Sequence, residues 1–159
     1  MKALVVYDSF FGNTEHVARA IAAELGAEPD VALRRAGDVD ASSLDGLDLL
    51  VVGSPTRAFS PSPAVKALLK QIPPRELQGV KVAAFDTRIA VEDTGSAILS
   101  FMIKLFGYAA KPILKRLTSK GGQAIEPAKG FYVANSEGPL KDGELERASE
   151  WARELARQL

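Results

Sequence analysis

The chain contains no cysteine, and among its 159 residues it has one histidine and one tryptophan. The lack of cysteine excludes disulfides, thiolate metal sites and cysteine nucleophiles. His16 is the single histidine, and one histidine without partner ligands is a poor basis for a metal site or a catalytic triad. We therefore expect neither a bound metal nor a catalytic side chain.

An excess of charge of one sign is also lacking, because 20 lysines and arginines balance 20 aspartates and glutamates. This balance provides no overall field to recruit nucleic acid or anionic lipid. The most apolar tract, AILSFMIKLFGY, is interrupted by Lys104 and is shorter than the roughly 20 residues that span a bilayer. The N-terminus has no cleavable signal pattern. These features predict a soluble cytoplasmic protein with no nucleic-acid partner and no membrane span.

Short apolar runs alternate with helical patterns along the whole chain. Runs of valine, leucine and alanine are typical of parallel strands that are buried on both faces. The expected strands are 3–7, 31–35, 49–53, 80–85 and 123–125. The first, third and fourth are continuously apolar and suit the interior of a sheet, whereas the second and fifth contain polar residues and suit its edges.

This alternation predicts parallel βαβ units with right-handed crossovers. Val17, Ile21 and Leu25 mark the apolar stripe of one intervening helix. The expected fold class is α/β, a single domain over residues 1–159. Its five-stranded parallel sheet is doubly wound in the order 2-1-3-4-5, with helices on both faces.

In such a sheet, ligands bind beyond the carboxyl ends of the strands, where the strand order reverses. DSFFGNT follows the first strand there, and it contains no lysine or arginine. A helix N-terminus offers unpaired N–H groups and partial positive charge, and Gly12 permits close approach of the backbone. Ser9 and Thr14 add hydroxyls and Asn13 adds an amide. The turn is either a phosphate site built from neutral donors or an ordinary helix cap made by Asn13 or Thr14.

Two segments resemble a known family. VVYDSFFGNTEHVA is similar to the opening of flavodoxins, whose phosphate loop is commonly Ser/Thr-x-Thr-Gly-x-Thr, and GSPTRAFSP is similar to their second flavin-contacting loop. The resemblance covers essentially the whole chain, and flavodoxin itself has the strand order 2-1-3-4-5 with FMN where the order reverses. It implies a short-chain, flavodoxin-like FMN-binding protein.

The resemblance also implies which residues bind FMN. The phosphate would be held by Ser9, Phe10, Phe11, Gly12, Asn13 and Thr14. One side of the flavin ring would face Pro55, Thr56, Arg57, Ala58 and Phe59, and the other side or edge would face Asp86, Thr87 and Arg88.

The chain departs from the usual flavodoxin pattern in these loops. Phe11 replaces the usual threonine and removes a hydroxyl donor. Flavodoxins typically sandwich the ring between aromatics, but here the second loop offers only Phe59 and the third loop offers none. Phe59 either stacks on the ring or packs under its loop. Arg57 and Arg88 are either solvated charges or cations that stabilise the reduced, anionic flavin.

The second loop, PTRAFS, contains no glycine, and a non-glycine residue pays on the order of 1 kcal/mol to adopt positive φ. The expected function is to carry electrons between a reductase or NAD(P)H and a partner protein or small acceptor. SPTRAF also resembles TPTRF of flavodoxin-like NAD(P)H:quinone reductases, so an enzyme is the alternative. A non-redox binding module with a degraded flavin site is the third hypothesis.

One apolar segment, Ser96 to Leu117, is longer than a single covering helix requires, and Gly107 and Pro112 predict a break within it. It is either a buried helix packed on the sheet, a cover for the flavin, or a homodimer interface. Its candidate contact residues are Phe101, Met102, Phe106 and Tyr108.

Overall fold

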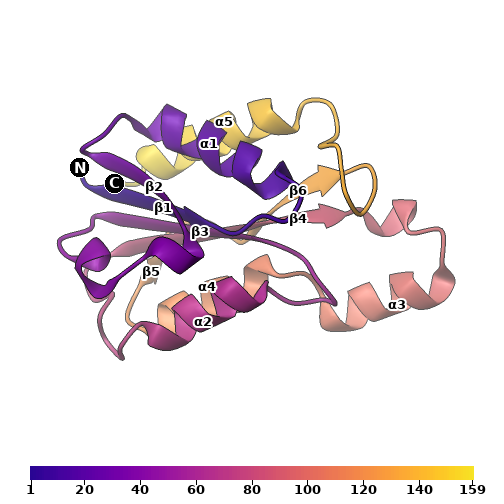
Figure 1. Cartoon of the computed structure of the whole chain (residues 1–159), viewed down its shortest axis with the longest axis horizontal. Helices are drawn as coiled ribbons and strands as arrows, with labels where there is room; N and C mark the ends of the chain where they lie inside the picture. Colours follow the sequence, from indigo (N-terminus) through magenta and orange to yellow (C-terminus); the bar gives the residue numbers. More distant parts are fainter.

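A parallel sheet runs through the middle of the protein in the computed structural model, which describes residues 1–159 (Figure 1). Its strands are β1 (Ala3–Tyr7), β2 (Val31–Arg35), β3 (Leu49–Pro55), β4 (Lys81–Ile89), β5 (Gln123–Ala124) and β6 (Lys129–Val133). They lie in the order β2-β1-β3-β4-β5, and β6 also pairs with β4. This confirms the predicted fold class and strand order.

The sixth strand is a correction to the expected five. Sequence reasoning placed the last strand at 123–125, but β5 has only two exposed residues and pairs with the beginning of β4. The longer edge strand is β6, whose Lys129 and Val133 lie beside Phe85 and Ile89 in the second half of β4. Within KGFYV only Phe131 and Val133 are buried, so this strand lacks the continuous apolar run of the interior strands.

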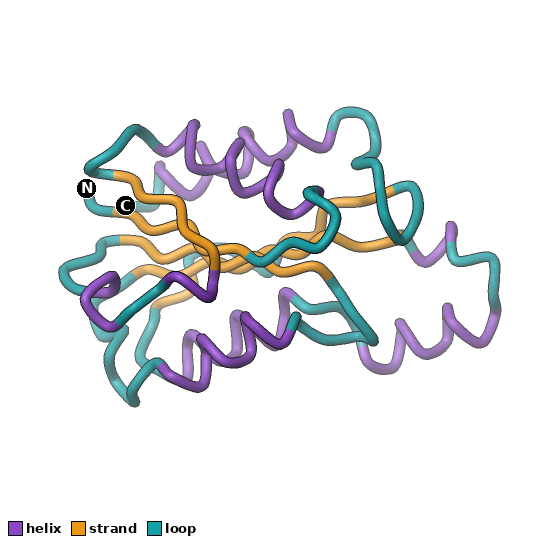
Figure 2. The backbone as a smooth tube through the Cα atoms, viewed as in Figure 1, coloured by secondary structure: helices purple, strands orange, loops and turns teal.

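The helices form two layers, one on each face of the sheet (Figures 1 and 2). α1 (Asn13–Leu25) and α5 (Glu144–Ala156) cover one face, whereas α2 (Pro63–Gln71) and α4 (Ala110–Ser119) cover the other. α3 (Ala97–Phe106) projects from the end of the molecule at which the strands finish. Short 3-10 helices lie in the connections: η1 (Ala36–Asp38), η2 (Ala41–Leu44) and η3 (Val91–Asp93).

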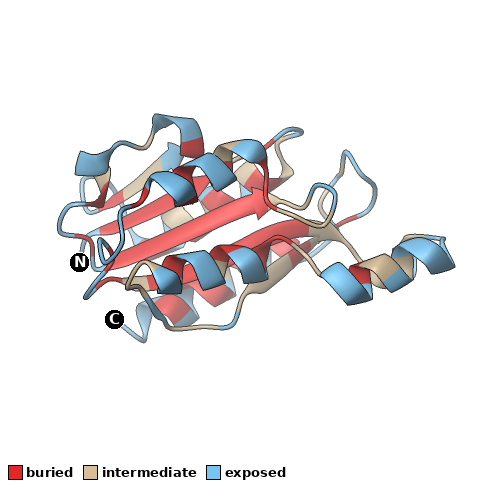
Figure 3. Ribbon diagram, turned by 90° about the horizontal axis from the view of Figure 1, so that it is seen from below, coloured by how far each residue is buried: buried red, intermediate tan, exposed pale blue.

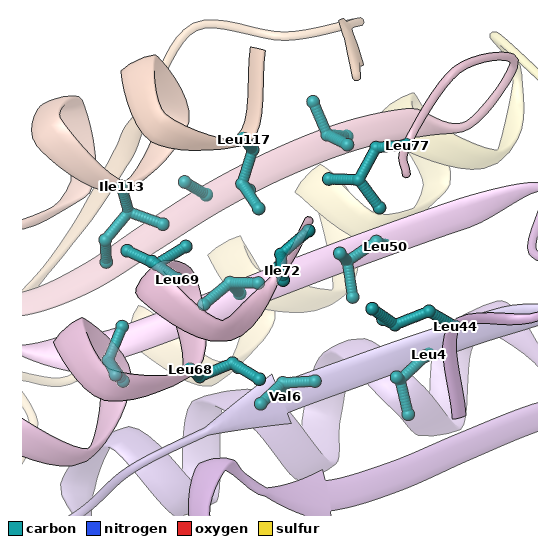
Figure 4. Packing of buried hydrophobic residues seen from close by; sticks show 14 of the residues in the cluster. Leu4, Val6, Leu44, Leu50, Leu68, Leu69, Ile72, Leu77, Ile113 and Leu117 are labelled. Carbon is teal, nitrogen blue, oxygen red and sulfur yellow. The ribbon is translucent and has the colours of Figure 1, made fainter. Parts of the chain in front are cut away.

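Alternating side chains of the interior strands fill two hydrophobic cores. Leu4 and Val6 face α2 and α4, where they join a cluster of 18 buried residues (Figure 4). The cluster on the opposite face has 17 buried residues, and Phe85, Phe131 and Trp151 meet there edge to face with centroids 5.9–6.2 Å apart. Both faces of β1, β3 and β4 are buried, so these strands are fixed in the core, and they all end at the same edge of the sheet (Figure 3).

The long apolar segment is divided into two helices with different surroundings. α3 ends at Gly107, which has a φ of 77°, and α4 begins at Ala110. The break predicted at Gly107 is therefore confirmed, whereas Pro112 lies in the first turn of α4, where proline is tolerated. α4 buries three residues on the sheet, but α3 buries only Ile103. The expectation of a buried helix is correct for the second half of the segment and wrong for the first.

Candidate flavin site

The loops that follow β1, β3 and β6, together with the end of β4, line a cavity of about 440 Å³ at the carboxyl edge of the sheet. This volume lies within the usual range for small-molecule sites. Of the fourteen residues predicted from the sequence, eleven line the cavity: Ser9, Phe10, Phe11, Asn13, Thr14, Pro55, Thr56, Arg57, Ala58, Thr87 and Arg88. The three that do not are Gly12, Phe59 and Asp86.

Gly12 shapes the turn after β1 without lining the cavity. It is the N-cap of α1 and has a φ of 92°, a left-handed conformation that side chains disfavour. Its N–H group donates a hydrogen bond to Ser9 Oγ at 3.0 Å. A Cβ atom at this position would meet only His16 Cε1 at 3.9 Å, so the backbone conformation, rather than lack of space, requires glycine.

The turn holds a group of backbone donors that have no partner within the protein. The N–H groups of Phe10, Phe11, Asn13, Thr14 and Glu15 make no intramolecular hydrogen bond. They lie at the N-terminus of a 13-residue helix, where the helix dipole adds partial positive charge. No side chain caps this helix. The structure therefore does not support the alternative of an ordinary cap, and the arrangement fits a phosphate group.

The side chains of the turn are already engaged with other loops. Thr14 Oγ1 is buried and lies 2.8 Å from Thr87 Oγ1, with which it shares a hydrogen bond. The Asn13 side-chain amide donates to the backbone oxygen of Glu137 at 3.0 Å. These two contacts tie the turn after β1 to the end of β4 and to the loop after β6. The backbone, more than these side chains, supplies the free donors.

Arg35, a cation beside the turn, is paired with carboxylates. Arg35 lies 3.4 Å from Asp8 and 3.7 Å from Glu15, and its guanidinium carbon is 5.4 Å from the centroid of the Tyr7 ring. The Arg19 hydrogen bond, with Arg35 nearby, lowers the pKa of Glu15 from its ordinary value. This pairing offsets the charge of Arg35, so the turn relies on neutral donors.

The two arginines of the candidate flavin loops have different environments. Arg57 forms no ion pair, and its guanidinium carbon lies 4.8 Å from the centroid of the Phe10 ring at the cavity wall. Arg88 donates to both oxygens of Asp86 at 2.6 and 2.7 Å and lies over the Tyr108 ring at 3.8 Å. Arg57 is therefore an uncompensated cation at the cavity, whereas the charge of Arg88 is neutralised by Asp86.

Asp86 has a structural position that differs from the expected one. Its side chain is completely buried, and besides Arg88 it accepts a hydrogen bond from the Ala110 N–H at 2.8 Å. Burial raises the pKa of Asp86 above its ordinary value, and the Arg88 guanidinium acts against this rise. Asp86 joins the end of β4 to the start of α4, which is why it does not reach the cavity.

Phe59 packs beneath its loop, which was one of its two expected roles. Its ring centroid lies 5.8 Å from that of Phe106 at the end of α3, and it lines a second cavity on that side. Ala58 and Phe59 have φ values of 46° and 65°, and two hydrogen bonds between Arg57 and Ser60 close the turn around them. Two-residue turns of this kind favour Asn-Gly, because left-handed conformations cost other residues about 1–2 kcal/mol each.

Four cavity residues were not predicted from the sequence: Ile89, Val133, Ser136 and Glu137. Three of them follow or end β6, the strand that the sequence pattern did not reveal. The polar stretch NSEG after the apolar FYVA was the available signal, because it has the same apolar-to-polar change as the other site loops.

The fold and the cavity together define a class of protein. It is a doubly wound α/β protein that offers a phosphate-binding turn where its strand order reverses. The sequence matches the family model described as flavodoxin over residues 5–151, so the chain belongs to the flavodoxin family. Members of this family bind FMN and transfer electrons. No match was found among curated proteins.

Solved structures share the fold at low sequence identity. Oxidised flavodoxin 2 from Bacillus cereus is 23% identical, with a TM-score of 0.75 and 100% of both chains covered. Flavodoxin 1 from the same organism is 17% identical, with a TM-score of 0.77 and coverage of 100% of this chain and 99% of that one. Rubredoxin oxygen:oxidoreductase from Desulfovibrio gigas is 24% identical, with a TM-score of 0.71, over 99% of this chain and 35% of that one.

The residues present fit FMN. The unpaired N–H groups between Phe10 and Glu15 suit its phosphate, and the cavity beside them has room for a small aromatic group between the loops after β3 and β4. The second ring-stacking aromatic that the family usually provides has no counterpart here, since the end of β4 contributes Thr87, Arg88 and Ile89. Phe10 and Phe11, each about half exposed, are the aromatics that line the cavity.

Proposed function

We propose that the protein carries electrons through bound FMN, between a reductase or NAD(P)H and a redox partner protein or small acceptor. The observation that carries this proposal is the set of five unpaired backbone donors at the head of α1, which opens onto the cavity. Membership of the flavodoxin family supports the same cofactor. When bound, FMN supplies the redox chemistry, and the protein supplies binding, orientation and electrostatics.

The chain's own groups divide these tasks. The five unpaired N–H groups at the head of α1 hold the phosphate, and the segments 55–58 and 87–89 flank the ring. Arg57 is the unpaired cation that favours negative charge in the cavity. No side chain needs to act as a nucleophile or as an acid.

A comparison of FMN with riboflavin tests the proposal, because the two differ only by the phosphate. Titration of the flavin-free protein, followed by fluorescence quenching, should show FMN binding at least about 100-fold more tightly, since hydrogen bonds to a charged group contribute about 1.5–3 kcal/mol each. Equal affinities would show that the donors do not hold a phosphate. No quenching by either compound would favour the non-redox binding module.

A second candidate function is an NAD(P)H-dependent quinone reductase. It is favoured by the absence of an aromatic cover from the loop after β4, which leaves the cavity accessible to a small substrate. Steady-state oxidation of NAD(P)H by the FMN-loaded protein with a quinone distinguishes the two functions. Turnover without a separate reductase supports the enzyme, whereas turnover that requires a reductase supports the carrier.

A further inference from the structure

The projecting helix α3 presents its apolar side chains to solvent. Ile98, Phe101 and Leu105 are 75%, 65% and 63% exposed, and their spacing places them on one face. The opposite face meets the rest of the protein through buried Ile103 and through Ser100, whose hydroxyl lies 2.9 Å from that of Thr94. A surface helix normally has the reverse arrangement, with its polar face outward. Figure 3 shows how far this exposed helix extends from the body.

The three helices on this side of the sheet are entirely free of acidic residues. α2, α3 and α4 lie below the sheet in Figure 1 and contain no aspartate or glutamate. Their six cations are all exposed, and none forms an ion pair: Lys66, Lys70, Lys104, Lys111, Lys115 and Arg116. These three helices therefore form a basic surface, and the acidic residues nearest to α2, Asp40 and Glu76, lie beside its C-terminal end.

The helices on the other side have the opposite charge. α1 and α5 contain six glutamates and three arginines. The equal numbers of acidic and basic residues in the chain thus conceal a separation between two faces. The expectation that charge balance leaves no field for an anionic surface does not hold for the face formed by α2, α3 and α4.

A groove joins the basic and apolar features. The second cavity, of about 920 Å³, is lined by Lys66 and Lys70 of α2, Arg116 of α4 and Phe106 at the end of α3. Three cations beside an exposed aromatic ring suit a phosphate group attached to an apolar chain. The groove therefore continues the apolar surface of α3 into a site with the chemistry of a lipid headgroup.

We propose that this face binds an anionic lipid bilayer, with α3 lying in the interface and the cations of α2 and α4 over the headgroups. Apolar residues on one face of a helix combined with neighbouring lysines and arginines are the features of interfacial helices. A convex helix enters a bilayer without a preformed partner groove. A second copy is a poorer occupant, because a symmetric pair would place six unpaired cations opposite six others.

The helix lies on the membrane and does not cross it. By length and composition alone, residues 97–119 would suffice to span a bilayer. However, Ile113 and Leu117 in α4 are fully buried in the core, which fixes that half of the segment on the sheet. α3 has ten residues and is about 15 Å long, half the thickness of a hydrocarbon core.

Co-sedimentation of the FMN-loaded protein with vesicles tests the proposal. Vesicles of phosphatidylcholine alone are compared with an equal mixture of phosphatidylcholine and phosphatidylglycerol at about 0.1 M salt. We expect at least tenfold stronger partitioning into the mixture. No binding to the mixture, or equal binding to both vesicles, would overturn the proposal.

Two sets of variants separate the apolar and basic contributions. F101S/L105S should lose at least tenfold in binding to the mixed vesicles, and K66Q/K70Q/R116Q about 100-fold, since each cation near an anionic surface contributes about fourfold to tenfold. Leu145→Ser and Arg157→Gln, on or beside α5, serve as matched controls and should bind like wild type. Circular dichroism checks that each variant is folded.

Sedimentation velocity without lipid tests the competing occupant. We expect a monomer whose state is unchanged by F101S/L105S. A dimer that dissociates in this variant would overturn the proposal in favour of a second copy. Because neither experiment measures flavin binding or reduction, failure of the membrane proposal is distinguishable from failure of the proposed electron-carrier function.

Discussion

At the scale of single residues, the pair formed by Asp86 and Arg88 has a role that its sequence position did not reveal. Both residues follow the strand predicted at 80–85, so sequence reasoning assigned both to the flavin, but in the structure β4 extends to Ile89 and includes them. The structure instead buries Asp86 beneath the loop, where it bonds Arg88 and the Ala110 N–H. Sequence position identifies the loop but not which side chains turn inward, because that depends on α4, a distant segment of the chain.

Arg88→Gln should strongly destabilise the protein. The substitution leaves a buried carboxylate without its cation, and breaking such a pair typically costs about 3–5 kcal/mol. The free energy of unfolding from urea titration measures the loss. Asp86→Asn added to Arg88→Gln removes the unpaired charge and should restore most of the stability. If the double variant is no more stable than the single one, charge burial is not the cause.

The same variant should depend on pH in a defined direction. Burial raises the pKa of Asp86, so the folded protein favours the protonated carboxyl, and its contribution to stability is lost as pH rises through the folded pKa. Without Arg88, only the hydrogen bond from the Ala110 N–H opposes the rise in the pKa of Asp86. The destabilisation by Arg88→Gln should therefore be largest at neutral pH and smaller near about pH 4, where the carboxyl is protonated. A loss that is independent of pH would contradict this explanation.

Arg57 should influence the reduction potential more than Arg88 does. Arg57 lines the cavity without a carboxylate partner, so it stabilises added negative charge there. Arg57→Gln should lower the two-electron midpoint potential of the bound flavin by about 30 mV, which corresponds to a tenfold change in relative affinity. Arg57→Lys keeps the charge and should recover most of this shift. An unchanged potential in Arg57→Gln would mean that this cation remains in solvent.

Replacement of Ala58 by glycine should stabilise the protein. The φ of 46° at Ala58 lies in the left-handed region, which glycine adopts without the steric cost that alanine incurs. After allowance for the greater freedom of glycine in the unfolded chain, Ala58→Gly should raise the free energy of unfolding by about 0.5–1 kcal/mol. Ala67→Gly, in the interior of α2, is the control and should lower it by about 1 kcal/mol. Two changes of the same sign would argue against strain in this turn.

At the scale of elements, the sequence pattern predicted the strands that consist of an uninterrupted run of buried apolar residues. β1, β3 and β4 were identified because their apolar runs have no polar interruption. β6 was missed because only Phe131 and Val133 of its five residues are buried, and its neighbours on β4 are known only after folding. The site residues that follow β6 were missed for the same reason.

The apolar segment after β4 shows a second limit of pattern reasoning. Leu105 in α3 and Leu117 in α4 belong to one hydrophobic stretch, but Leu105 is 63% exposed and Leu117 is fully buried. Hydrophobicity alone does not distinguish a side chain packed on the sheet from one displayed to a partner.

Matched leucine substitutions should separate these two helices. Leu117→Ala removes fully buried methyl groups and should lower the free energy of unfolding by about 2–5 kcal/mol. Leu105→Ala removes little buried area and should change it by less than about 0.5 kcal/mol. Urea denaturation of both variants at one pH gives the comparison. A large loss in Leu105→Ala would mean that α3 packs against the protein in solution.

At the scale of the whole molecule, alternation of strands and helices predicted the α/β class, and the continuously apolar first strand predicted a strand order with that strand in the interior. The distribution of charge was not predicted, because the basic residues of α2 and α4 come together only when the chain crosses the sheet (Figure 1). A net charge of zero in the sequence therefore says little about either face.

This separation of charge should be visible in ion-exchange chromatography near pH 7. The two helix layers lie on opposite faces of the sheet (Figure 1), and charges are screened over about 10 Å at 0.1 M salt, so each face interacts largely independently. We expect the wild-type protein to be retained on a cation exchanger under these conditions despite its formal net charge of zero.

K66Q/K70Q/R116Q should elute much earlier. E146Q/E150Q/E154Q, on the α5 side, raises the net charge by the same number but leaves the basic face unaltered, so its retention on this resin should increase only slightly. Passage of the wild-type protein through the column would show that the six cations do not act as one surface.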